Sequence, residues 1–209
     1  IMSGPGAGAK KDELIALLKN EELREKQISL LVQLAVEEKY HGLDLDFESI
    51  EPKNLPDLAT YVEDLALALH TQGKTLAVSI ETHPNDVVLS SWQRIGKAAD
   101  NVRLMAYGKK SPVPAPITDL AWMRARVSHA LRVIPKEKLT VGLPLYCLRW
   151  EGSTTRSSTW QKYHTQTSSV VCENAASVKE KVYILHELGI TDIAFWRLGG
   201  EDPKIWENL

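Results

Sequence analysis

The chain has 209 residues, a length that fits one large domain or two small ones. Hydrophobic residues make up 44% and charged residues 25% of it, which is usual for a folded globular protein and excludes a disordered tail, a collagen and a disulfide-rich miniprotein. Lys and Arg number 25 against 27 Asp and Glu, and the net charge of −2 argues against nucleic-acid binding and against a polybasic membrane surface.

Hydrophobic periodicity divides the chain into alternating helices and strands, and no apolar run approaches the roughly 18 residues that a membrane span needs. In chain order the pattern predicts a helical segment at 10–39, a strand at 42–47, a helix at 57–70, a strand at 74–80, a helix at 88–99, a strand at 101–107, a helix at 117–133, a strand at 138–146, a helix at 175–188 and a strand at 192–198. The Ser- and Thr-rich segment 151–171 is expected to be a loop or a polar hairpin inserted before the last helix.

This order predicts an α/β fold with βαβ crossovers and a parallel sheet, as in a (β/α) barrel or a doubly wound sheet. An eight-stranded barrel typically takes about 250 residues. Five clear strands are predicted here, with Ile1 and Met2 as the stub of a sixth, so an intact barrel is hard to fit. A doubly wound nucleotide-binding fold is the rival, but no glycine-rich phosphate motif follows a predicted strand.

The chain has two cysteines, Cys147 and Cys172, too few for a disulfide framework. They can form one disulfide or remain as two buried thiols, and the sequence leaves both readings open. No Cys and His spacing is typical of a zinc site, and no signal peptide is recognisable in residues 1–9.

The most informative segment is the predicted strand HGLDLDFE at 41–48. Because side chains alternate along a strand, Asp44, Asp46 and Glu48 are expected on one face and the apolar residues on the other. Crowded carboxylates share protons and separate their pKa values, which acid catalysis at neutral pH uses. Two other readings are a solvated edge strand and a divalent-metal site, which His41 does not favour because its odd spacing turns it away from the acids.

Three further segments follow in the same order as in a known family. The segments are LMAY at 104–107, VGLPLY at 141–146 and FWRLGGEDP at 195–203. Together with HGLDLDFE they resemble the strand motifs of glycoside hydrolase family 18, the chitinases and N-acetylglucosaminidases, with the bacterial branch of spore-germination peptidoglycan hydrolases nearest. The resemblance runs from about residue 10 to the end and implies a (β/α)8 TIM-barrel type of fold.

In that family the acidic motif ends barrel strand four, so the resemblance implies that this chain carries strands four to eight in a single domain over 1–209. The first strands of the barrel are then missing, and the missing N-terminal part is an expected partner. The resemblance also implies substrate-assisted retaining hydrolysis of chitin-like or peptidoglycan chains. No cofactor and no metal are expected.

The resemblance assigns the site residues one by one. Glu48 is expected to be the general acid and base, Asp46 to hold the substrate's acetamido group, and Asp44 to share a proton with Asp46. The residues expected to bind the sugar are Tyr107 through the acetamido carbonyl, Trp196 as the floor of the subsite, Tyr146, and Met105 in the pocket wall.

Some positions depart from the family pattern. His41 replaces the first Asp of the acidic motif, Gly108 replaces an Asp that usually follows the strand-six Tyr, and Cys147 stands where Gly often follows the strand-seven Tyr. Glu81, after the second predicted strand, could substitute for a lost acid. The chain is thus expected to be a glycosidase, secreted or in the cell envelope because its substrates lie outside the cytoplasm. The alternatives are a non-catalytic chitinase-like lectin and a half-barrel without a site of its own.

Overall fold

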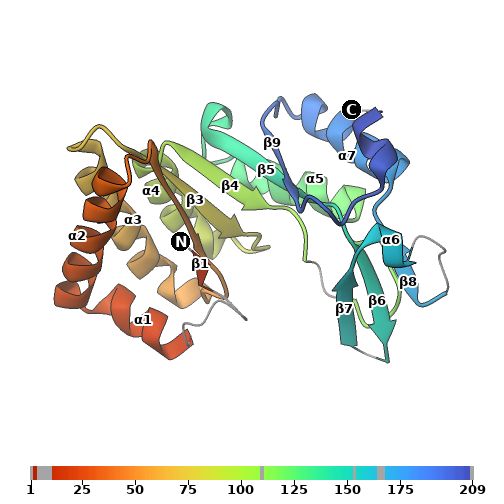
Figure 1. Cartoon of the computed structure of the whole chain (residues 1–209), viewed down its shortest axis with the longest axis horizontal. Helices are drawn as coiled ribbons and strands as arrows, with labels where there is room; N and C mark the ends of the chain where they lie inside the picture. Colours follow the sequence, from red (N-terminus) through yellow and green to blue (C-terminus); the bar gives the residue numbers. More distant parts are fainter. Residues whose placement is uncertain (1, 4–10, 109–110, 153, 164–167, 208–209) are drawn as a thin grey trace. The chain divides into compact units, whose positions relative to one another are not determined.

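The computed structural model of the protein describes residues 2–3, 11–108, 111–152, 154–163 and 168–207. The chain forms two compact units (Figure 1), which we call unit 1 (Ile1–Leu104 and His129–Leu139) and unit 2 (Met105–Ser128 and Thr140–Leu209). No helix among the described residues is both long and apolar enough to cross a membrane. The single glycosidase-like domain expected over 1–209 stays a prediction.

Unit 1 contains strands in the order β1 (Met2–Ser3), β2 (Gly42–Phe47), β3 (Thr75–Glu81) and β4 (Asn101–Met105, whose last residue belongs to unit 2). β1 and β3 both run parallel to β2, as the βαβ pattern predicts. Gly42 opens β2 beside Thr75, and a Cβ on Gly42 would overlap the Thr75 carbonyl. A glycine is therefore required where β2 begins next to β3.

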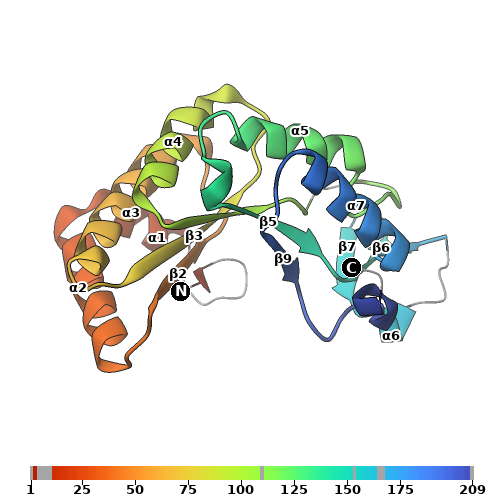
Figure 2. The same cartoon turned by 90° about the horizontal axis from the view of Figure 1, so that it is seen from above.

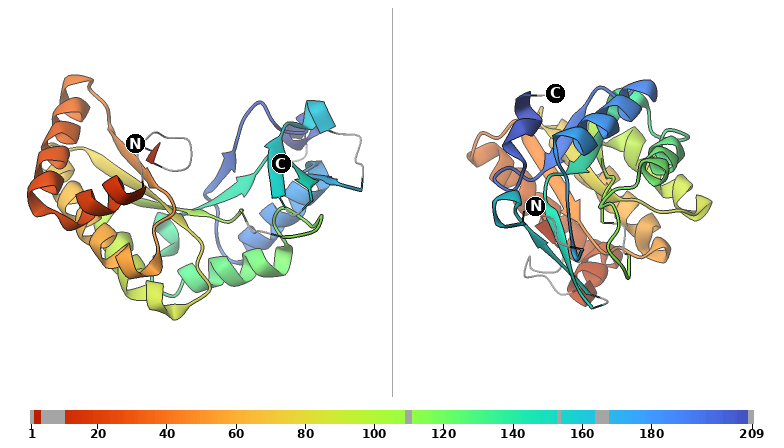
Figure 3. Two further views of the ribbon diagram at one scale, coloured as in Figure 1. Left: turned by 90° about the horizontal axis from the view of Figure 1, so that it is seen from below. Right: turned by 90° about the vertical axis from the view of Figure 1, so that its right-hand side faces the viewer.

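Unit 1 also contains the helices α1 (Lys11–Lys19), α2 (Glu21–Glu37), α3 (Leu55–His70) and α4 (Leu89–Ala98). Figures 2 and 3 show α2, α3 and α4 in a row on one face of β2 and β3. The apolar residues of β2 face this row: Leu45 is fully buried, and the Phe47 ring lies 5.5 Å from that of Tyr61 on α3. The acidic face of β2 is consequently turned away from the helices, as the alternation predicts.

The helical segment expected at 10–39 is two helices. Asn20 separates them, and its side chain caps α2 by accepting the Leu23 N–H at 3.0 Å. An asparagine at a helix start is a signal that the sequence carries, but the continuous apolar spacing on both sides outweighs it in a periodicity argument. The other helices and strands of the prediction are present, several of them shorter by a few residues at their ends.

Unit 2 is built on β5 (Leu139–Pro144, from Thr140 on) and β9 (Ile193–Trp196), which pair in parallel. Helix α5 (Leu120–Ala130, up to Ser128) begins after Asp119, whose carboxylate accepts the Trp122 N–H at 2.8 Å. The expected helix at 117–133 is therefore shorter. Helix α7 (Ala175–Glu187) precedes β9 and begins with a capping box between Asn174 and Ser177.

An additional antiparallel sheet is formed by the part of the chain between β5 and α7. It consists of β6 (Cys147–Glu151), β7 (Thr154–Ser158) and β8 (Val170–Cys172) in the order β7-β6-β8, with the short helix α6 (Trp160–Tyr163) before β8 (Figure 1). From the sequence, the segment 151–171 is expected to be either a loop or a polar hairpin. The sheet begins at Cys147, earlier than that segment, because β6 pairs with both β7 and β8.

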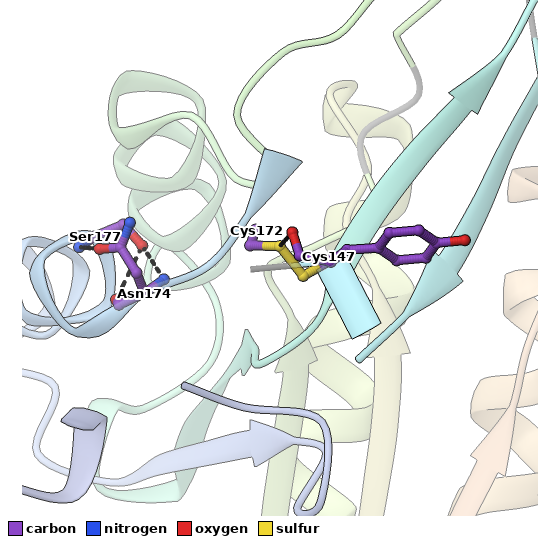
Figure 4. Close-up of a disulfide and its surroundings, with 5 residues drawn as sticks. Cys147, Cys172, Asn174 and Ser177 are labelled. Carbon is purple, nitrogen blue, oxygen red and sulfur yellow. Dashed lines mark hydrogen bonds between the residues drawn. A yellow bond between two sulfur atoms is a disulfide. The ribbon is translucent and has the colours of Figure 1, made fainter. Parts of the chain in front are cut away.

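Cys147 and Cys172 form a disulfide between β6 and β8. Of the two possibilities that the sequence leaves open, a disulfide or two buried thiols, the structure has the first. The two residues are direct partners in the antiparallel register of these strands, and Figure 4 shows the bond between their sulfur atoms. Their neighbours in the chain are Tyr146 and Glu173, and the Glu173 N–H donates to the Tyr146 carbonyl at 3.1 Å. The disulfide and this hydrogen bond together hold the chain just before β6 against the chain just after β8.

Replacing both cysteines by serine is expected to lower the free energy of unfolding by about 3 kcal/mol, because a cross-link over a separation of 25 residues restricts the unfolded chain. Urea denaturation measures the difference. A reducing agent should destabilise the wild-type protein by a similar amount and leave the Cys147→Ser/Cys172→Ser variant unchanged. Equal stability of the two proteins under oxidising conditions would contradict the expected contribution.

Candidate active site

The three acids at the end of β2 form an acidic row, Asp44, Asp46 and Glu48, on one face of the strand. All three side chains are half-buried, whereas Leu45 and Phe47 between them are buried on the opposite face. Carboxylates spaced two residues apart on one strand face lie close enough to repel each other when all are ionised. The arrangement therefore favours protonation of at least one of them.

The surroundings raise the pKa of two of these acids above their usual values. Burial raises the pKa of Asp46 most, and the negative charge of Asp44 adds to it, while Arg103 acts in the opposite direction. Burial also raises the pKa of Glu48, followed by the charges of Asp46 and Glu81. A carboxyl group with a raised pKa keeps its proton to higher pH, which is the property that a general acid needs.

Arg103 on β4 forms an ion pair with Asp44, in which its guanidinium donates a hydrogen bond to the carboxylate. This arginine was not among the site residues predicted from the sequence. A signal for it exists: Val102 and Leu104 are buried and Arg103 between them faces the other way, so alternation in β4 marks it. The row is therefore bound to a cation at Asp44, while the pKa values of Asp46 and Glu48 are raised above their usual range.

Unit 2 contains a cavity of about 470 Å³. Three of the residues expected to bind sugar, Tyr107, Tyr146 and Trp196, line it together. The other lining residues are Leu148, Ser157, Ser158, Thr159, Arg197 and Gly200. Aromatic rings with hydroxyl groups around them suit a sugar, whose C–H faces are apolar and whose edges form hydrogen bonds.

The aromatic residues of the cavity differ in exposure. The Trp196 side chain, at the end of β9, is 47% exposed, and the peptide bond that follows it to Arg197 is cis. Burial and the nearby Glu173 raise the pKa of Tyr146 to about 12, so its hydroxyl stays protonated. The cavity thus offers an accessible indole face and a phenolic hydroxyl donor.

The cavity wall lacks one residue that the sequence predicted there and includes three that it did not. Met105 is buried at the end of β4 and is not among the residues lining the cavity, so its assignment to the sugar site stays a prediction. Ser157, Ser158 and Thr159 were not expected there, because the polar segment 151–171 has no periodicity that shows where it packs. Across the described ranges, no cluster of three or more His, Cys, Asp or Glu residues is arranged to hold a metal ion.

Comparison with known proteins adds a family and a set of similar folds. The family described as "Glycosyl hydrolases family 18" matches residues 4–201. Among curated proteins of Bacillus subtilis, the "Uncharacterized glycosylase YvbX" is 21% identical over 92% of this chain and 67% of its own length. The "Cortical fragment-lytic enzyme" is 21% identical over 95% of this chain and 56% of its own length. The chain thus spans little more than half of several curated relatives.

Solved structures confirm the type of fold. A chitinase from Chromobacterium violaceum superimposes with a TM-score of 0.84 at 21% identity, over 99% of this chain and 76% of that one. The spore cortex-lytic enzyme SleL of Bacillus cereus gives a TM-score of 0.80 at 19% identity, over 99% of this chain and 56% of that one. The expected α/β fold of the TIM-barrel type is confirmed, and the absence of the first barrel strands stays a prediction.

Proposed function

Because this chain belongs to family 18 of the glycosyl hydrolases, we propose that it hydrolyses glycans containing β-linked N-acetylglucosamine, with Glu48 as general acid and base. The observation that carries the proposal is the half-buried position of Glu48 at the end of the acidic row, where burial and the charges of Asp46 and Glu81 raise its pKa. A carboxyl group with a raised pKa keeps its proton to higher pH and can protonate the glycosidic oxygen as the bond to the leaving sugar breaks.

The proposed reaction uses the substrate's own acetamido group as the nucleophile. Its carbonyl oxygen attacks the anomeric carbon while Glu48 gives its proton to the leaving oxygen, which forms an oxazolinium ion. Asp46 holds the acetamido N–H and balances the positive charge of this ion. Water then attacks the anomeric carbon and gives a proton to Glu48, so the sugar is released with retained configuration and the enzyme is restored.

Asp44 and Arg103 would set the charge of the row. Arg103 forms an ion pair with Asp44, and the charge of Asp44 is one of the causes of the raised pKa of Asp46. A proton shared by Asp46 and Asp44 leaves the acid function to Glu48, and this proton resides on Asp44 while Asp46 balances the charge of the oxazolinium ion. In the cavity of unit 2 we assign Trp196 to stacking on a sugar ring, and Tyr107 and Tyr146 to hydrogen bonds with its polar groups.

The names of the relatives support a peptidoglycan substrate beside a chitin-like one, since a cortical fragment-lytic enzyme and chitinases are both among them. Such substrates lie outside the cytoplasm, and we propose that the protein acts there. The disulfide between Cys147 and Cys172 supports this location, because disulfides persist in oxidising compartments.

The proposal is tested by incubating the protein with N-acetylglucosamine oligomers and with purified peptidoglycan, and by following the release of reducing ends. Cleavage that retains the anomeric configuration supports it. Binding without cleavage by the wild-type protein would favour the lectin alternative, and the absence of both would contradict the proposal for this chain.

The positive charge of Arg197 in the cavity wall indicates which kind of glycan should bind more tightly. Of the residues that line the cavity, it is the one with a charged side chain, so a sugar bearing a carboxylate gains a charge-assisted hydrogen bond there. We expect Arg197→Gln to weaken binding of fragments that contain muramic acid roughly tenfold, and to leave neutral oligomers nearly unaffected. Calorimetric titration with both ligands measures this. Arg156→Gln on β7, outside the lining, is the matched control, and equal losses for both ligands would contradict the expectation.

A further inference from the structure

Glu81 ends β3 beside the last acid of β2. In the parallel register of these strands Asp46, two residues before Glu48, is opposite Ser79, two residues before Glu81, and the charge of Glu81 acts on Glu48. Because residues two apart point to the same face of a strand, Glu81 faces the side on which the acidic row lies. Sequence position alone suggested Glu81 as a substitute acid, whereas the contacts of its carboxylate indicate another role.

The carboxylate of Glu81 is bonded to the backbone directly after Glu48. The Ser49 N–H donates to Glu81 Oε2 at 2.8 Å. Ser49 has a φ of 62°, in the left-handed region that residues with a Cβ seldom adopt. A residue in this conformation persists where its surroundings hold it, and a charged acceptor on its N–H is such a restraint.

We propose that Glu81 is a positioning residue for Glu48: its carboxylate holds the turn at Ser49, and it places a second negative charge beside the acid. The inference rests on the proposed function, in which Glu48 is the general acid. Glu81 itself touches no reacting atom in this assignment, and its effect on the reaction passes through Glu48.

The charges around Glu48 determine the direction of the effect. β2 contributes the charge of Asp46 and, two residues earlier, that of Asp44, which is bound to Arg103 of β4. β3 contributes Glu81, and after Glu48 the carboxylate of Glu51 is bound to Lys11 and Lys53. Burial is the largest cause of the raised pKa of Glu48, followed by the charge of Asp46 and then by the charge of Glu81. Removal of the Glu81 charge should therefore lower the pKa of Glu48, and the acid should lose its proton at a lower pH.

Two substitutions separate the charge from the hydrogen bond. Glu81→Gln keeps an oxygen that can accept the Ser49 N–H and removes the negative charge. We expect it to move the alkaline limb of the kcat/KM profile about 0.5 to 1 pH unit lower, with kcat at the optimum near that of the wild type. Glu81→Ala removes both, and we expect the same shift together with a roughly tenfold or larger loss of kcat, because the turn after Glu48 is no longer held.

A titration without substrate keeps the test independent of the proposed function. In protein labelled with ¹³C at glutamate carboxyl groups, the Glu48 signal is assigned by its absence from Glu48→Gln, and its pKa is followed by NMR. A lower Glu48 pKa in Glu81→Gln supports the inference even where no glycan is cleaved, a result that would contradict only the proposed function. An unchanged Glu48 titration overturns the inference, whatever the activity.

The matched control is Glu137→Gln, which removes an exposed carboxylate on the short helix Lys136–Lys138 that is not among the groups acting on Glu48. We expect it to change neither the Glu48 titration nor the pH profile. The same shift in this variant would overturn the inference, because it would show that overall charge suffices. If Glu81→Ala does not fold, as judged by thermal melting, Glu81→Gln alone decides.

Discussion

Glu48→Gln is expected to reduce hydrolysis of N-acetylglucosamine oligomers by roughly 10²- to 10⁴-fold. The glutamine amide has nearly the same shape as the carboxyl group, but it has no proton to give to the leaving oxygen and cannot take one from the attacking water. Because the change removes chemistry and not shape, the sugar should still bind. Initial rates of reducing-end release, together with calorimetric titration of the same oligomers, measure both quantities.

Glu51→Gln provides the matched control for this experiment. Glu51 lies three residues further along, is bound to Lys11 and Lys53, and has a pKa lowered to about 2 by these lysines. It is therefore ionised at neutral pH and cannot act as a general acid, so its substitution should leave the rate near that of the wild type. A Glu48→Gln variant that retains most of the activity would rule out Glu48 as the acid.

Lys181→Met is expected to lower the free energy of unfolding by about 3 to 5 kcal/mol. Lys181 on α7 and Glu173 before it form an ion pair at 2.6 Å, with both side chains only 3% exposed. Ser177, which forms the capping box with Asn174 seen in Figure 4, also donates to the Glu173 carboxylate at 2.5 Å. Without the lysine, the carboxylate stays buried with one donor fewer, which is the costly state of a broken buried pair. Chemical denaturation measures the difference.

Two further variants test the cause of this loss. Glu173→Leu combined with Lys181→Met replaces both charges by apolar groups, and we expect it to recover most of the stability, because no unpaired charge is left inside. Glu187→Gln breaks the exposed pair with Arg124 at the other end of α7 and should change stability by about 1 kcal/mol at most. A single variant as stable as the wild type would contradict the contribution assigned to the buried pair.

The buried pair also bears on the cavity. Glu173 donates its N–H to the Tyr146 carbonyl, and its charge adds to the burial that raises the pKa of the Tyr146 hydroxyl. The same segment contains the disulfide to Cys147. Two interactions inside unit 2, one covalent and one ionic, therefore restrain the residue that we assign to sugar binding.

Local patterns in the sequence were sufficient for most of the secondary structure. The alternation of LDLDFE in β2 predicts a strand with one apolar and one acidic face, and the buried Leu45 and Phe47 bear this out. Such patterns work because residues that share a face of a strand or helix are separated by fixed spacings. The antiparallel sheet of β6, β7 and β8 has no such pattern, since its polar strands are specified by pairing with one another across the insert.

The sequence by itself determined the α/β class and the acidic row, and its resemblance to a known family pointed to the aromatic residues that we assign to sugar binding. Only the tertiary structure decided the pairing of Cys147 with Cys172, the bond of Arg103 to Asp44, and the bond of Glu81 to the Ser49 turn. Each of these contacts joins residues that are distant in the chain and have no spacing rule between them. Their geometry follows from strand register and packing, which local periodicity does not specify.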